Sequence, residues 1–149
     1  MRDARWLPVV GFEGLYEVSD HGGVRRAKSG RLLRGSPNKR GYCTVILYRD
    51  RKQHSKSVHL MVLEAHVGPR PDGLMGCHGP GGQQDNHVAN LRWDTQSNNV
   101  RDQLKYGTHP SGATEYACGR GHVRTAENTY WKRGCRDCDS TTRSARKAG

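Results

Sequence analysis

The stretch Cys77-His78-Gly79-Pro80, followed by Asn90-Leu91-Arg92-Trp93 and then by Thr95-Gln96-Ser97-Asn98-Asn99, decides the fold that we predict. Asn90 lies 12 residues after His78, and Asn99 lies 21 residues after it. The pattern indicates a strand ending at His78, a loop, a second short strand and a helix with Thr95, or alternatively Asp94, as its N-cap. This arrangement would gather one imidazole and two amides into a compact polar site.

Length and composition limit what this chain can build. Its 149 residues leave room for one domain or for two or three small modules. A hydrophobic content of 33%, 19 glycines and one phenylalanine argue against a single large core and favour small modules, some held by metal. We expect no membrane span and no secretory signal, because the chain has no long apolar run, and therefore a cytoplasmic location.

The net charge of +11 is concentrated in the two ends of the chain. Residues 1–57 hold 13 Lys/Arg against 5 Asp/Glu, and residues 118–149 hold 8 against 3, whereas residues 58–117 hold 4 against 6. Basic flanks around a slightly acidic centre suit a protein that neutralises phosphates, although such charge can also serve solubility alone. The candidate contacts are Arg25, Arg26, Lys28, Arg31, Lys39, Arg40, Arg143, Arg146 and Lys147.

The N-terminal part, residues 1–57, has the character of a small β-rich module. Strands are predicted at 15–19 and 24–26, a buried strand at 42–48 and a hairpin tip at 49–52. Trp6, the stretch Gly11-Phe12-Glu13-Gly14-Leu15-Tyr16-Glu17-Val18-Ser19 and Gly23-Val24-Arg25 together resemble the NUMOD4 motif. This resemblance implies a module that often precedes the nuclease core of HNH enzymes encoded by phages and introns.

A helix is predicted over residues 58–66, with Leu60, Leu63 and Val67 on one face. His59 and His66 lie on it, and we expect both to be structural rather than metal ligands. The Gly/Pro-rich residues 68–73 should end this helix before the strand that leads to His78.

Residues 58–107 resemble the HNH endonuclease family, whose core is the ββα-metal fold. The resemblance implies that His78 is a general base, that Asn90 orients it and that Asn99 is a ligand of a divalent metal, Mg²⁺, Mn²⁺ or Zn²⁺. A neutral imidazole suits the role of a base near pH 7. The alternative, a surface histidine in a glycine-rich loop, does not account for the spacing of the two asparagines.

Several positions near this motif leave alternatives open. Cys77 stands where many family members carry Asp or His as a second metal ligand, and it is either a thiolate ligand or an inert residue. Asp85 and Asp94 could add oxygen donors, but turn or cap roles are expected. A one-residue shift of register would exchange the key asparagines for Asn86 or Asn98.

The last segment, residues 118–149, contains a second set of metal-type residues. Cys118 and His122, with Cys135 and Cys138, form Cys-x3-His and Cys-x2-Cys pairs that predict one structural zinc site. Cys43 and Cys77 stand apart from this set. Residues 108–117 have the composition of a linker, and the segment ends in a basic tail.

The sequence thus predicts an α+β protein with three parts, namely residues 1–57, the nuclease core at 58–107 and the zinc module at 118–149. By resemblance, the expected function is a metal-dependent, phage or homing-type HNH endonuclease acting on double-stranded DNA, cutting one strand per catalytic centre. The alternative is a non-catalytic, zinc-containing DNA-binding or packaging accessory protein. The sequence leaves the oligomeric state open.

Overall fold

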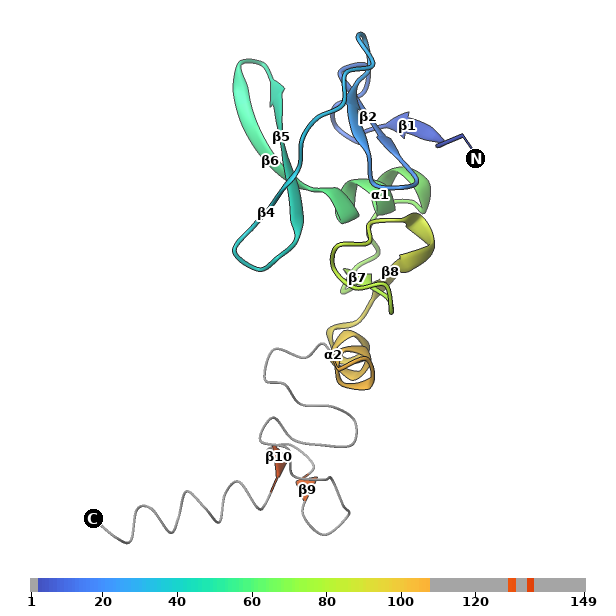
Figure 1. Ribbon diagram of the computed structural model, residues 1–149, viewed down its shortest axis with the longest axis vertical. Helices are drawn as coiled ribbons and strands as arrows, with labels where there is room; N and C mark the ends of the chain where they lie inside the picture. Colours follow the sequence, from blue (N-terminus) through green and yellow to red (C-terminus); the bar gives the residue numbers. More distant parts are fainter. Residues whose placement is uncertain (1–2, 108–128, 131–133, 136–149) are drawn as a thin grey trace, which may run out of the picture. The chain divides into compact units, whose positions relative to one another are not determined.

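The computed structural model describes residues 3–107 together with 129–130 and 134–135, and it divides into two compact units (Figure 1). The first unit is Met1–Gln96 and the second is Ser97–Gly149. The predicted linker at 108–117 lies outside the described residues. So do the side chains of the predicted zinc ligands Cys118, His122, Cys135 and Cys138, and of the tail residues Arg143, Arg146 and Lys147.

A three-stranded antiparallel sheet opens the first unit. It consists of β1 (Trp6–Pro8), β2 (Tyr16–Ser19) and β3 (Val24–Arg26), adjacent in chain order. Tyr16 and Val18 alternate with Glu17 and are buried, as expected for a strand with one face on the core. The predicted strands at 15–19 and 24–26 are therefore confirmed.

A second antiparallel sheet contains β4 (Ser36–Pro37), β5 (Cys43–Arg49) and β6 (Lys52–Ser57). Asp50 and Arg51 have φ angles of 52° and 61°, as a two-residue hairpin turn with both central residues left-handed requires, which confirms the predicted hairpin tip. The strand predicted as buried is buried on one face only, because Ile46 and Tyr48 are 49% and 53% exposed.

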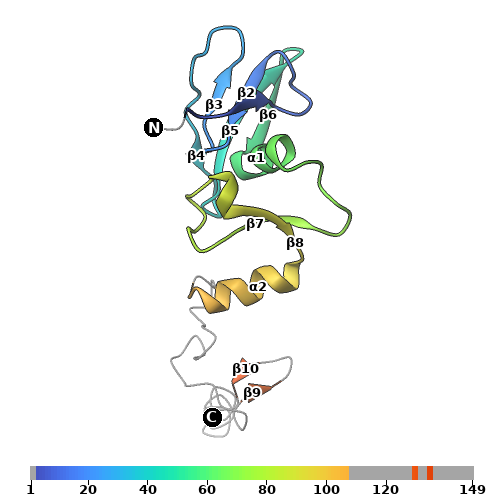
Figure 2. The same cartoon turned by 90° about the vertical axis from the view of Figure 1, so that its right-hand side faces the viewer.

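Helix α1 (Val58–His66) follows β6 without a break and has the predicted bounds. Its predicted apolar face is only partly correct, because Leu63 is buried whereas Val67 is 55% exposed. Met61 and Val62 are fully buried instead. The reason is that α1 contacts strands of both sheets and also the hairpin that follows, so more than one stripe of the helix is covered (Figure 2).

The antiparallel hairpin of β7 (Met75–His78) and β8 (Leu91–Asp94) packs against α1. A 3₁₀ turn, η1 (Val88–Asn90), leads directly into β8. A side chain at Gly76 would approach Leu60 of α1 to 2.7 Å, so glycine permits the close packing of β7 on α1.

Residues of both sheets, α1 and the hairpin share one hydrophobic core. Val18, Leu47, Val62 and Leu91 belong to the same buried cluster. The predicted division at residue 57/58 is therefore not a boundary between separate cores, because α1 supplies apolar side chains to both parts. Trp93, partly buried, packs against this cluster and donates a hydrogen bond from Nε1 to the carbonyl of Gly68 at 3.1 Å.

The second unit contains α2 (Gln96–Lys105), whose first residue still belongs to the first unit. Gly107, with a φ of 68°, follows the helix as predicted. Two short strands, β9 (Thr129–Tyr130) and β10 (Gly134–Cys135), pair antiparallel. None of the helices described in this chain is long and apolar enough to cross a membrane.

Candidate active site

His78 ends strand β7, and its imidazole ring lies in a cluster of three rings. The ring of Tyr42 is stacked on it at a centroid distance of 5.7 Å, and the ring of His59 lies 4.8 Å away. Tyr42 precedes β5 and His59 belongs to α1, so three segments of the first unit meet at this ring. The ring of His78 is thereby confined on two sides by aromatic neighbours.

The polar contact of His78 is made by Asn86. The Nε2 atom of His78 lies 3.2 Å from the Oδ1 atom of Asn86. The amide group of Asn86 is assigned with its Nδ2 donating to the carbonyl of Gln84 at 3.4 Å, so Oδ1 accepts from Nε2–H. In the neutral ring this tautomer leaves Nδ1 of His78 without a proton.

The electrostatic surroundings favour a neutral His78. Burial lowers the pKa of His78 below its usual value of 6.5, and this effect outweighs the opposing contributions of the Asn86 hydrogen bond and the Asp85 charge. The ring is therefore a proton acceptor at neutral pH, as a general base must be.

Asn90 acts on the loop between the strands. Its Oδ1 accepts from the backbone N–H of Gly81 at 2.9 Å. Its Nδ2 donates to the carbonyls of Gly82 and Asp85 at 3.2 and 2.8 Å, and its own carbonyl accepts from Gly79 at 2.7 Å. Asn90 therefore holds the backbone of the loop that carries Asn86.

Asn86 is 9% exposed and packs against the turn between β2 and β3. A Cβ atom at Gly22, whose φ is 84°, would lie 2.7 Å from Cβ of Asn86. The backbone N–H of Val88 donates to the carbonyl of Asp20 at 2.8 Å, which ties the same loop to the same turn. The sequence motif offered Asn86 only as a shifted register, and it carried no signal for the support by Gly22.

His59 is the second histidine of the cluster and, unlike His78, it is buried. It is 7% exposed, and its Nδ1 atom has no hydrogen-bond partner among the described residues. Burial, with a smaller contribution from His78, lowers the pKa of His59 to about 4. His66, in contrast, has Nε2 3.2 Å from the carbonyl of Val18, which agrees with the expected structural role.

Cys77 and His78 project from opposite faces of β7, because side chains alternate along a strand. Cys77 is 2% exposed, and its thiol lies 3.6 Å from the carbonyl of Met75.

Within the described residues, no three His, Cys, Asp or Glu side chains are grouped so that they could hold a metal ion. Asn99 lies on α2 in the second unit, which is described separately.

Asp85 and Asp94 make local hydrogen bonds, as expected of Asp85 in a turn. Asp85 accepts a hydrogen bond from the backbone N–H of His87 at 3.1 Å. Asp94 accepts from Arg92 Nε at 2.8 Å and from the backbone N–H of Thr95 at 2.7 Å, next to the start of α2.

The basic candidates of the N-terminal part differ in accessibility. Arg25 donates from Nε to Glu17 across the sheet at 2.7 Å, and its guanidinium lies 4.1 Å from the ring centroid of Trp6. Arg25 therefore already has an intramolecular ion pair and a contact with an aromatic ring. The remaining candidates are exposed, namely Arg26, Lys28, Arg31, Lys39 and Arg40.

Comparisons with known proteins show which proteins this chain is similar to. Residues 5–48 match the NUMOD4 motif. DNA endonuclease I-HmuI of Bacillus phage SP01 is 36% identical over 103 residues, which are 69% of this chain and 59% of the phage protein. An uncharacterized HNH endonuclease of Acanthamoeba polyphaga mimivirus is 27% identical over 103 residues, 69% of this chain and 31% of the viral protein.

A solved structure also resembles this fold. It is a structure of the HNH homing endonuclease I-HmuI that concerns DNA binding and cleavage by that enzyme. The TM-score is 0.63 and the sequence identity is 36%. The match covers 70% of this chain and 60% of that one, so the chain spans about three fifths of this relative. These similarities support an HNH endonuclease with an N-terminal NUMOD4 motif, the resemblance that the sequence predicted.

Proposed function

We propose that this chain is a metal-dependent DNA endonuclease in which His78 is the general base that activates water to cleave a phosphodiester. The observation that carries this proposal is the state of His78, a neutral ring with Nε2 bonded to Asn86. With Nε2 occupied as a donor, Nδ1 takes the proton from the attacking water. A positioned general base contributes about 10²–10⁴-fold in rate.

Two asparagines position the base in this mechanism. Asn86 fixes the tautomer of His78, and Asn90 holds the loop backbone on which Asn86 stands. Tyr42 and His59 limit rotation of the His78 ring. Restricting the base to one orientation in this way lowers the entropy that must be lost when water and phosphate are aligned.

A divalent ion, when bound, would relieve charge on the scissile phosphate. The donor set suits such an ion in part. The amide oxygen of Asn99 is a ligand for Mg²⁺ or Mn²⁺, whereas the thiol of Cys77 is a ligand for Zn²⁺. By the resemblance to the HNH family, we assign Asn99 as a ligand of this ion. Cys77 is buried and projects from the face of β7 opposite His78, which favours the inert role that the sequence left open.

We further propose a structural zinc held by Cys118, His122, Cys135 and Cys138. Support comes from the spacing of the two ligand pairs. The backbone pairing of Gly134–Cys135 with Thr129–Tyr130 adds a short hairpin next to one ligand pair. A closed shell of four ligands gives this ion a role in folding rather than in the reaction.

The test is a plasmid assay with Mg²⁺, Mn²⁺ and Zn²⁺ supplied separately. One ββα-metal centre cuts one strand, so nicked circles should form before linear DNA. His78→Ala should remove cleavage while DNA affinity stays near that of the wild type. Asp72→Ala, a change at an exposed side chain in the loop between α1 and β7, is the control and should cleave normally.

The alternative function is a DNA-binding or packaging accessory protein without catalysis. It would be supported by tight binding to duplex DNA with no cleavage under any of the three metals. DNA as the substrate and action inside a host cell are parts of the proposal that rest on the phage relative, and the double-stranded form is proposed from the resemblance in the sequence.

A further inference from the structure

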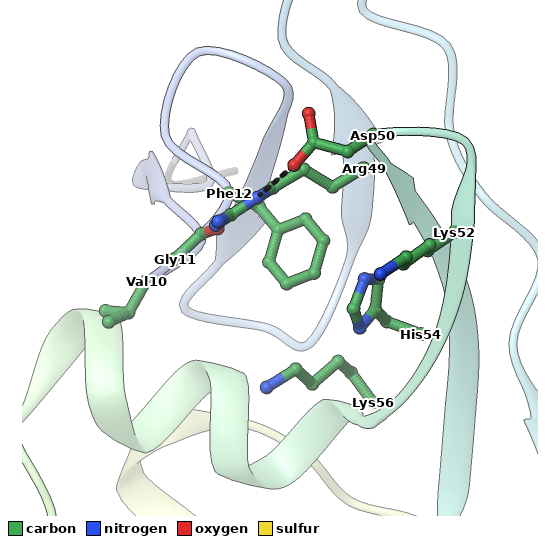
Figure 3. A pocket seen from close by; sticks show the side chains of 8 residues that line it. All are labelled: Val10, Gly11, Phe12, Arg49, Asp50, Lys52, His54 and Lys56. Carbon is green, nitrogen blue, oxygen red and sulfur yellow. Dashed lines mark hydrogen bonds and ion pairs between the residues drawn. The ribbon is translucent and has the colours of Figure 1, made fainter.

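A basic pocket lies in the first unit on the β5–β6 hairpin, where the loop after β1 meets it (Figure 3). Its volume is about 410 Å³, and His78 does not line it. The side chains that matter for its chemistry are those of Phe12, Arg49, Asp50, Lys52, His54 and Lys56. The pocket is separate from the ring cluster described above and from the exposed basic residues of segments 26–40.

The charge in this pocket is strongly unbalanced. Arg49, Lys52 and Lys56 supply three cations, and Asp50 supplies the one carboxylate among the lining residues. Asp50 lies 3.3 Å from Arg49 Nε with its side chain 81% exposed, so water screens this pair. An anion would compensate the remaining positive charge.

The strand register brings the cations together. Arg49 and Lys52 are direct partners across the hairpin, and like charges in that position destabilise a sheet. Lys52, His54 and Lys56 follow one another at every second residue of β6 and therefore project from one face. A bound phosphate would turn this unfavourable pairing into a favourable one.

The floor of the pocket is fixed before any ligand binds. Phe12 is 5% exposed, and its ring contacts the ring of His54 at a centroid distance of 5.3 Å. The charged groups of Arg49 and Lys56 lie 5.9 and 5.8 Å from the centroid of Phe12. Arg49 also donates to the carbonyl of Gly11, which holds its guanidinium at the pocket wall.

We propose that this pocket binds phosphate groups of the DNA backbone, an inference that rests on the proposed function. Lysine and arginine side chains supply its cationic donors, which suits contacts that position a duplex without reading its sequence. The surrounding segment, residues 1–57, carries 13 Lys/Arg against 5 Asp/Glu and so adds long-range attraction for the same partner. Free inorganic phosphate has the same chemistry and is tested separately.

The experiment measures duplex affinity as a function of salt for the full chain. Each lost phosphate contact reduces the slope of log K against log salt by about 0.9. Lys52→Gln with Lys56→Gln should therefore make the slope shallower by about 2, equally on unrelated duplexes. The matched control changes the exposed Arg5 and Arg34, outside the pocket, to Gln and should leave the slope near the wild type.

Three outcomes would overturn the proposal. The first is a salt slope of the pocket variant that equals the slope of the control variant. Inorganic phosphate, followed by NMR at the β5–β6 hairpin, could bind the wild type while the DNA slope is unaffected by the lysine changes. Wild-type protein that fails to bind DNA would reject the proposed function as well. If the double variant does not fold, Lys52→Gln alone, at an exposed position, should reduce the slope by about 1.

Discussion

Asn86→Ala tests whether the hydrogen bond to His78 is part of the catalytic machinery. The change removes the Oδ1 atom that lies 3.2 Å from Nε2 and leaves a half-buried N–H of His78 without its partner. Leaving such a group unsatisfied costs about 1–3 kcal/mol. If that cost falls on the oriented base, the cleavage rate at saturating DNA should fall by about 5- to 150-fold, at 1.36 kcal/mol per tenfold.

The pH dependence separates this role from a general loss of structure. His78 must be neutral to accept a proton, so the rate should fall as pH decreases through its pKa, which lies below 6.5. The Asn86 bond raises that pKa, so Asn86→Ala should move the acid limb to lower pH while the plateau decreases. Asn86→Asp places a carboxylate beside the ring and should move the limb to higher pH.

The assay follows plasmid nicking between pH 5 and 8 at a temperature where each variant is folded. Asn90→Ala serves as the comparison, because Asn90 bonds Gly81, Gly82 and Asp85 rather than the ring. The Asn90→Ala change should lower the melting temperature and leave the acid limb of the pH profile at its wild-type position. An Asn86→Ala protein with the wild-type plateau and an unmoved limb would show that Asn86 only supports the loop.

Three further predictions concern stability and metal content. Gly22→Ala should destabilise the protein by about 1–3 kcal/mol in thermal unfolding, because its φ is 84° and a Cβ atom would lie 2.7 Å from Asn86; a melting temperature equal to the wild type would contradict this packing. The pKa of His59 is about 4 in the folded protein, against 6.5 for an ordinary histidine. Between these two pH values the unfolded state binds more protons than the folded state. The contribution of His59 to the free energy of unfolding is therefore fully present above pH 6.5 and decreases as the pH falls toward 4. His59→Leu should remove that part of the decrease, about 3 kcal/mol, in urea titrations at the two ends of the window. Purified protein should contain about one zinc per chain, and Cys135→Ser should release it; metal analysis that finds no zinc in the wild type would reject the site.

Local sequence signals predicted the elements that depend on neighbouring residues. The bounds of α1 agreed with the pattern of residues 58–66, and the hairpin tip at Asp50 and Arg51 followed from its charged, strand-flanked sequence. The buried face of α1 was less predictable. Its exposure depends on two sheets and a hairpin that meet it from different sides, which no periodicity within the helix can encode.

The surroundings of His78 show where sequence reasoning loses its basis. The spacing of His78 and Asn90 predicted the hairpin, but the residue that bonds the ring is Asn86 in the intervening loop. The position of Asn86 depends on Gly22, which belongs to the turn of a different sheet. Contacts between segments so distant in the chain leave no regular pattern within either segment, so neither motif alone could identify them.

This arrangement also changes how the NUMOD4 segment is understood. A module that only held DNA could be removed without disturbing the His78 ring. Here the turn at Asp20 and Gly22 bonds and packs against the loop of Asn86, and Tyr42 stacks on the ring itself. Because residues 5–48 contain all three contacts, the motif supports the geometry of the proposed base as well as carrying basic residues. A nuclease core cut free at residue 58 would lose the support on which the orientation of His78 depends.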